Sequence, residues 1–115
     1  MPQSRSKGAR GEREAAAAWE AATGLPAERT AQRCGRNGTA DILVGSEQLH
    51  CEVKRRASLS ALAFLRQAES DAASGSTPFV LMREDGDTRW VAMVRLDDLV
   101  RLAEVLTDAR RRPVL

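Results

Sequence analysis

Hydrophobic residues recur along the chain in two kinds of pattern, and each kind predicts a type of secondary structure. Intervals of three and four residues predict amphipathic helices, whereas short hydrophobic or alternating runs bounded by turn-forming residues predict strands. The predicted helices span residues 8–23, 58–73 and 96–109. The predicted strands span residues 27–32, 40–44, 49–53, 79–83 and 89–94. This order of elements predicts an α/β fold, in which helices pack on a mixed sheet of parallel and antiparallel strands.

The first and last predicted helices have the clearest hydrophobic stripes. In the first helix the stripe includes Trp19 and ends in a carboxylate, because Glu12 lies seven residues before Trp19, almost two helical turns away. The polar and basic residues 1–7 ahead of this helix predict a loose arm. In the last helix, the residues predicted to point inward are Leu96, Leu99, Val100, Leu102, Ala103 and Leu106.

The strands within residues 40–53 have a predictable register. A symmetric turn centred between Ser46 and Glu47 pairs Ile42 with Cys51. Because side chains alternate between the two faces of a sheet, this register collects hydrophobic residues on one face. The other residues predicted on that face are Ala40, Val44, Leu49 and Val53.

The opposite face of this hairpin has polar side chains. Asp41 is directly opposite Glu52, with Lys54 one step beyond. Opposed carboxylates repel each other unless a cation lies between them, and Mg²⁺, for which Mn²⁺ can substitute, is the hard, oxygen-preferring ion that fits. Lys54 can then hold a phosphate or help to deprotonate a metal-bound water, so the pattern predicts metal-assisted phosphodiester hydrolysis. The alternative is a half-exposed hairpin with a solvated polar face, on which we expect His50, the only histidine, to be structural.

These residues resemble the active-site motif of the PD-(D/E)XK nucleases, an Asp at the start of one strand and Glu-x-Lys at the end of the next. Here the motif is Asp41 and Glu52-Val53-Lys54, although Ala40 stands where the family usually has Pro. Residues 7–14, KGARGERE, are similar to the KGxxxERE opening of archaeal-type Holliday junction resolvases and related phage nucleases. The resemblance implies a restriction-endonuclease-like core in which Glu12 reaches the metal site.

The resemblance also implies a function, a Mg²⁺-dependent, structure-selective DNA endonuclease that resolves four-way junctions in DNA recombination. Asp41 and Glu52 would bind the metal with Glu12, and Gln67, on the helix after the Glu-x-Lys strand, would lie near the site. A homodimer is expected, because two nicks must be placed symmetrically across the junction. Three alternatives remain open. The first is a nuclease of the same fold with another DNA target, such as a nicking, repair or restriction-like enzyme, and the second is a non-catalytic DNA-binding protein of that fold. The third is a structural or interaction protein without a DNA partner, which would show no salt-dependent binding to DNA.

The charge distribution favours a polyanionic partner. The net charge is only +2, but residues 1–56 contain ten Lys/Arg and seven Asp/Glu, whereas residues 57–115 contain eight and nine. A basic half of this kind is typical of proteins that contact DNA phosphates. The candidate phosphate contacts are Lys7, Arg10, Arg33, Arg36, Arg55 and Arg56.

Length and composition predict one domain, because 115 residues suffice for a single hydrophobic core. No run approaches the roughly 20 hydrophobic residues that span a bilayer, and the start of the chain lacks a signal-peptide pattern. We therefore expect a cytoplasmic protein of a bacterial or phage-infected cell, without membrane contact. The two cysteines are too few for a disulfide framework or a zinc site.

Overall fold

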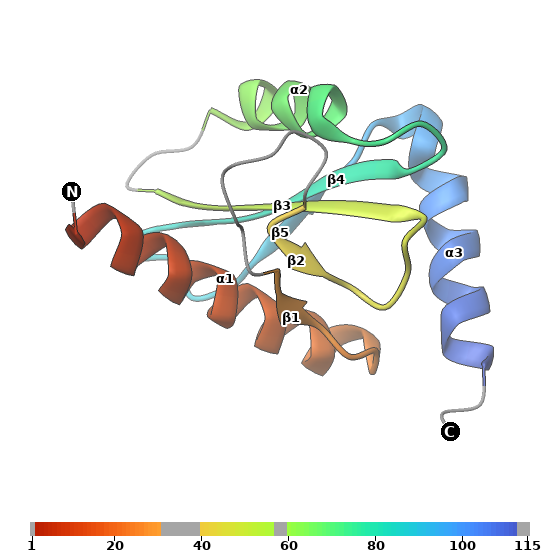
Figure 1. The fold of residues 1–115 in the computed structure, drawn as a ribbon, viewed down its shortest axis with the longest axis horizontal. Coiled ribbons are helices and arrows are strands. Elements are labelled where there is room, and N and C mark those ends of the chain that lie inside the picture. The colour runs from red at the N-terminus through yellow and green to blue at the C-terminus, as the bar shows by residue number, and fades with distance from the viewer. Residues whose placement is uncertain (1, 31–39, 57–59, 113–115) are drawn as a thin grey trace.

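The computed structural model describes residues 2–30, 40–56 and 60–112, which form three helices and a five-stranded sheet (Figure 1). The elements, in chain order, are α1 (Pro2–Thr23), β1 (Glu28–Arg29), β2 (Ile42–Leu43), β3 (Leu49–Arg56), α2 (Ala61–Asp71), β4 (Thr77–Glu84), β5 (Val91–Met93), the 3-10 turn η1 (Leu96–Asp98) and α3 (Leu99–Arg111). This is the predicted order of helices and strands. None of the helices in these three ranges combines the length and hydrophobicity needed to cross a lipid bilayer.

The sheet is mixed, as predicted, with the spatial order β1-β2-β3-β4-β5. The strands β3 and β4 are parallel, and the other neighbours are antiparallel. Parallel strands require a crossover connection, and α2 provides it between β3 and β4. The pair Ile42–Cys51 joins β2 to β3 in the predicted register.

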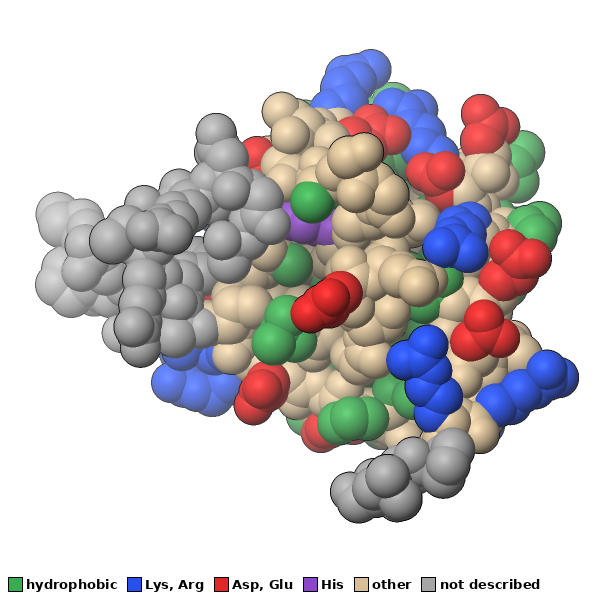
Figure 2. Space-filling view, turned by 45° about the vertical axis from the view of Figure 1, so that its right-hand side comes forward, with side chains coloured by type: hydrophobic (Ala, Val, Ile, Leu, Met, Phe, Trp, Pro, Cys, Tyr) green, Lys and Arg blue, Asp and Glu red, His purple; other side chains and the backbone are tan. Residues whose placement is uncertain are grey.

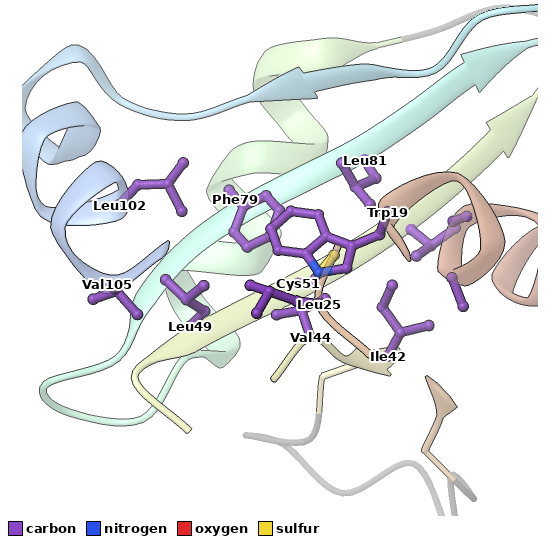
Figure 3. Close-up of a cluster of buried hydrophobic side chains, with 13 residues drawn as sticks. Trp19, Leu25, Ile42, Val44, Leu49, Cys51, Phe79, Leu81, Leu102 and Val105 are labelled. Carbon is purple, nitrogen blue, oxygen red and sulfur yellow. The ribbon is translucent and has the colours of Figure 1, made fainter. Parts of the chain in front are cut away.

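The main hydrophobic core lies between the sheet and the helices α1 and α3. Figure 3 shows Trp19 of α1 and Leu102 and Val105 of α3 packed against side chains from β3 and β4. The rings of Trp19 and Phe79 are 5.4 Å apart between centroids. A smaller cluster lies on the other face, where α2 contributes Leu65 and Ala68 to it. The sheet therefore has two covered faces, and β4 contributes hydrophobic side chains to the clusters on both.

Residues 1–7 were predicted to form a loose arm, and the structure differs from this prediction. The helix α1 begins at Pro2, so residues 2–7 are helical. Proline is well tolerated at the first helical position, where its missing N–H would have no helical partner and its fixed φ suits the helix. The basic composition of the segment concealed this start.

The inward face of α3 also differs from the prediction. Leu96, Leu99 and Val100 are exposed, by 81%, 48% and 69%, and Ala103 is exposed as well. The prediction is confirmed for Leu102, which is buried, and for Leu106, which packs partly buried against the core, whereas the buried Val105 was not predicted. The hydrophobic residues of this helix cover more than half of its circumference, so their periodicity alone does not identify the buried side. In addition, η1 turns residues 96–98 out of the α-helical phase.

Candidate active site

The carboxylate of Asp41 is held at the point where β2 separates from β3. The last regular pair is Ile42–Cys51, and the backbone N–H of Asp41 still donates to the Cys51 carbonyl at 3.0 Å. One step further along β3, the N–H of Val53 donates to the Asp41 carboxylate at 2.8 Å. In a longer β2, a backbone carbonyl would accept the hydrogen bond from the N–H of Val53. Here the Asp41 carboxylate accepts it, and this contact fixes the carboxylate beside the sheet.

Asp41 and Glu52 lie close enough to share a hydrogen bond. Burial, the hydrogen bond to Glu52 and the negative charge of Glu52 raise the pKa of Asp41 from 3.8 to about 7. Burial would also raise the pKa of Glu52, but hydrogen bonds from His50 and Asp41 and the nearby positive charge of Lys54 lower it. Below about pH 7 and without a metal, the pair therefore holds one proton, on Asp41, next to an ionised Glu52, which is the behaviour of two carboxyl groups forced together.

His50 is hydrogen-bonded to Glu52 on the same face of β3. Its Nε2 lies 2.9 Å from Oε1 of Glu52, and the two side chains are only 3% and 6% exposed. Because a carboxylate only accepts hydrogen bonds, Nε2 is the protonated ring nitrogen. The alternation of side chains along β3 predicted this face for His50, but the hydrogen bond to Glu52 was missed. The only sign of this hydrogen bond in the sequence is that His50 and Glu52 are two residues apart, which places both side chains on the same face of a strand.

Lys54 follows His50 and Glu52 on the same face of β3, the face that is covered by α2. Its Nζ lies 5.5 Å from the centroid of the Phe64 ring, a distance at which an ammonium is attracted to the face of an aromatic ring. Arg56, two residues further along β3, also lies over this ring, at 5.9 Å. The charge of Lys54 contributes to the low pKa of Glu52, so the ammonium is near the carboxylate pair.

Glu12 is near the pair but makes an ion pair of its own. Its negative charge contributes to the raised pKa of Asp41. Its Oε1 accepts a hydrogen bond from Nε of Arg29 in β1, at 2.8 Å. The structure thus brings Glu12 into the neighbourhood of Asp41 from α1, with one carboxylate oxygen bound to a cation of the protein.

Arg55 faces away from these residues, which argues against the predicted contact with a DNA phosphate. Its Nη1 is 3.1 Å from Glu14 of α1, and its Nε is 3.5 Å from Asp85 in the turn after β4. Glu14 also binds Arg83 of β4 at 2.9 Å. The alternation along β3 directs Arg55 to the α1 face and Lys54 to the α2 face, so Arg55 belongs to an ion-pair network that fixes α1 on the sheet. Neither Glu14 nor Arg83 was predicted to have this role.

The remaining predicted residues are not gathered at the site. Gln67 is exposed on α2, without a hydrogen bond to any other described residue, and Arg10 is exposed on α1. The side chain of Lys7 and the residues Arg33 and Arg36 lie outside the part of the chain that the structure describes. Of the five predicted catalytic residues, the structure thus gathers four in one region, which are Glu12, Asp41, Glu52 and Lys54.

Comparisons of the chain with family models, with curated proteins and with solved structures gave no match. Within residues 2–30, 40–56 and 60–112, no group of three or more His, Cys, Asp or Glu side chains is close enough to hold a metal ion. Of the three predicted metal ligands, Asp41 and Glu52 share a hydrogen bond, whereas Glu12 is bound to Arg29. One or two carboxylates are what Mg²⁺ uses in proteins when waters and substrate phosphates complete its coordination.

Proposed function

We propose that this protein is a Mg²⁺-dependent DNA endonuclease in which Asp41 and Glu52 bind the metal. The observation that supports the proposal most directly is the pairing of these two carboxyl groups, which together with burial raises the pKa of Asp41 to about 7. A divalent cation would take the place of the shared proton and remove the repulsion between the carboxylates. The donor set consists of hard oxygens, which Mg²⁺ and Mn²⁺ prefer.

The residues around the pair have complementary roles in phosphodiester hydrolysis. When bound, Mg²⁺ supplies Lewis-acid stabilisation of the phosphate and an acidified water. Lys54 is partly exposed and contributes an ammonium that can hold the scissile phosphate against this centre. Glu12 is assigned to the outer edge of the site, acting directly or through water, because one of its oxygens already holds Arg29.

The order of these residues supports a restriction-endonuclease-like core of the PD-(D/E)XK type. Asp41 immediately precedes β2, Glu52 and Lys54 lie on the adjacent antiparallel strand β3, and a helix follows β3. The opening of α1, KGARGERE, favours an enzyme similar to Holliday junction resolvases, with four-way DNA junctions as the substrate. We therefore place junction DNA ahead of the nicking, repair or restriction-like targets of related nucleases.

A homodimer is the assembly that such a substrate requires, because two symmetric cuts need two active sites. The exposed hydrophobic side chains of η1 and α3, Leu96, Leu99 and Val100, support this side of the molecule as the contact between two copies. Figure 2, in which the side of the molecule that carries α3 comes forward, shows hydrophobic side chains interspersed with charged ones, a mixture that suits a modest interface with a polar rim.

Cleavage of a synthetic four-way junction tests the proposal. The wild type is expected to cut the junction with Mg²⁺ and not with EDTA, and to cut it faster than a linear duplex of the same sequence. Glu52→Ala is expected to bind the junction and leave it intact. Junction binding without cleavage by the wild type in Mg²⁺ or Mn²⁺ would indicate a non-catalytic DNA-binding protein, and cleavage by Glu52→Ala would refute the assignment of the site.

A further inference from the structure

The hydrogen bond between His50 and Glu52 is the most enclosed polar contact beside the carboxylate pair. Both side chains are almost fully buried, and their distance of 2.9 Å is that of a well-formed hydrogen bond. A buried ionised carboxylate is costly unless it is hydrogen-bonded, so this contact accounts for part of the stability of an ionised Glu52 inside the protein. It also occupies one defined oxygen, Oε1.

The geometry excludes direct contact of His50 with a substrate. The side chain is only 3% exposed, and the ring nitrogen that faces Glu52 is already hydrogen-bonded to it. A general acid or base must reach the proton that it transfers, and a phosphate ligand must reach an exposed oxygen of DNA. His50 meets neither condition, so any role in the reaction must act through Glu52.

We propose that His50 is a positioning residue that holds the Glu52 carboxylate in the orientation needed to bind a divalent cation. This inference rests on the proposed function, because it assumes that Glu52 is a metal ligand. A free glutamate side chain has several rotatable bonds, and each orientation that it samples lowers the fraction that can bind the ion. The hydrogen bond to Oε1 removes much of this freedom before the metal arrives and leaves the other lone pairs of the carboxylate available.

The expected size of the effect comes from supporting residues at metal sites in general. Loss of a hydrogen bond to a metal ligand lowers metal affinity or activity by about 10–100-fold. A substitution that keeps the donor at the same distance from the backbone should restore the affinity. Glutamine places its amide nitrogen close to the position of Nε2 of histidine, whereas the shorter asparagine places it near Nδ1 and does not reach Glu52.

Binding of Mn²⁺ to the DNA-free protein at pH 8, followed by the electron paramagnetic resonance signal of free Mn²⁺, tests this role. His50→Leu and His50→Asn should raise the Kd for Mn²⁺ by about 10–100-fold, and His50→Gln should stay within about threefold of the wild type. Near-ultraviolet circular dichroism checks that each variant is folded. Glu52→Gln provides the reference for a site without its carboxylate.

The outcomes separate this inference from the function on which it rests. Mn²⁺ binding by the wild type that is lost in Glu52→Gln, with an unchanged Kd in folded His50→Leu, would overturn the role of His50 and leave the metal site in place. If His50→Leu does not fold, equal Kd values for His50→Gln and His50→Asn would overturn it. If the wild type and Glu52→Gln bind Mn²⁺ with the same Kd, Glu52 is not a metal ligand. That result would refute both the proposed metal site and the role of His50.

Discussion

The raised pKa of Asp41 makes a direct prediction about stability. In the metal-free protein, a carboxyl whose pKa is raised by folding contributes stability that is fully present below pH 3.8 and is lost as the pH rises to about 7. Asp41→Asn removes this titration, while its amide can still accept from Val53 and donate to Glu52. The variant should therefore be closest in stability to the wild type at pH 4, exceed it increasingly as the pH rises to about 7, and be more stable than the wild type at pH 8.

The magnitude follows from the two pKa values. A change from 3.8 to about 7 corresponds to about 4 kcal/mol, which is the upper limit of the destabilisation at pH 8. Asp41 is partly exposed, and solvent screening reduces its interaction with Glu52, so we expect a difference of about 1–3 kcal/mol. Added Mg²⁺ should remove this penalty in the wild type and have little effect on Asp41→Asn, which has lost one of the two carboxylates.

Urea unfolding followed by tryptophan fluorescence measures this difference, in EDTA and in Mg²⁺, at several values between pH 4 and pH 8. Asp108→Asn, which changes an exposed aspartate of α3, is the matched control and should follow the wild type throughout. Free energies of unfolding for the wild type and Asp41→Asn that run parallel across this pH range would refute the reasoning, because they would mean that burial and the neighbouring Glu52 do not raise the pKa of Asp41.

Three further predictions concern the proposed role of Lys54, the ion pairs of Glu14 and the proposed dimer. Lys54→Met keeps the side-chain stem over Phe64 but removes the charge, and should lower kcat for junction cleavage by about 100-fold or more with folding retained; activity within a few-fold of wild type would contradict it. Glu14→Gln should cost about 1–3 kcal/mol in urea unfolding, because two arginines lose a charged partner, whereas the exposed control Glu104→Gln should cost little. Val100→Glu should convert a dimer to a monomer in sedimentation, and an unchanged assembly would place the interface elsewhere.

The polar hairpin could be predicted from the sequence because its information is local. Strand alternation and a symmetric turn fix the register, so the pair Ile42–Cys51 and the common face of Asp41 and Glu52 follow from a few neighbouring residues. The order of the sheet elements followed in the same way, from short hydrophobic runs and the segments between them.

The contacts of Arg55 could not be predicted in this way, because its partners come from distant parts of the chain. Glu14 precedes Arg55 by 41 residues and approaches it only when α1 packs on the sheet. From the sequence alone, a basic residue next to Lys54 is equally compatible with a phosphate contact and with an internal ion pair. The buried side of α3 was missed for a related reason, since only the packed sheet decides which of two hydrophobic stripes faces inward.

The segment at the start of α1 has a structural role beside the one that its resemblance implies. A side chain at Gly11 would bring its Cβ within 3.3 Å of the Cβ of Arg55, so the absence of a side chain allows the helix to lie close against β3. Three residues later Glu14 binds Arg55, and in between Glu12 turns towards Arg29 and the region of Asp41. The same short stretch thus docks the helix on one face of β3 and places the negative charge of Glu12 close enough to Asp41 to contribute to its raised pKa.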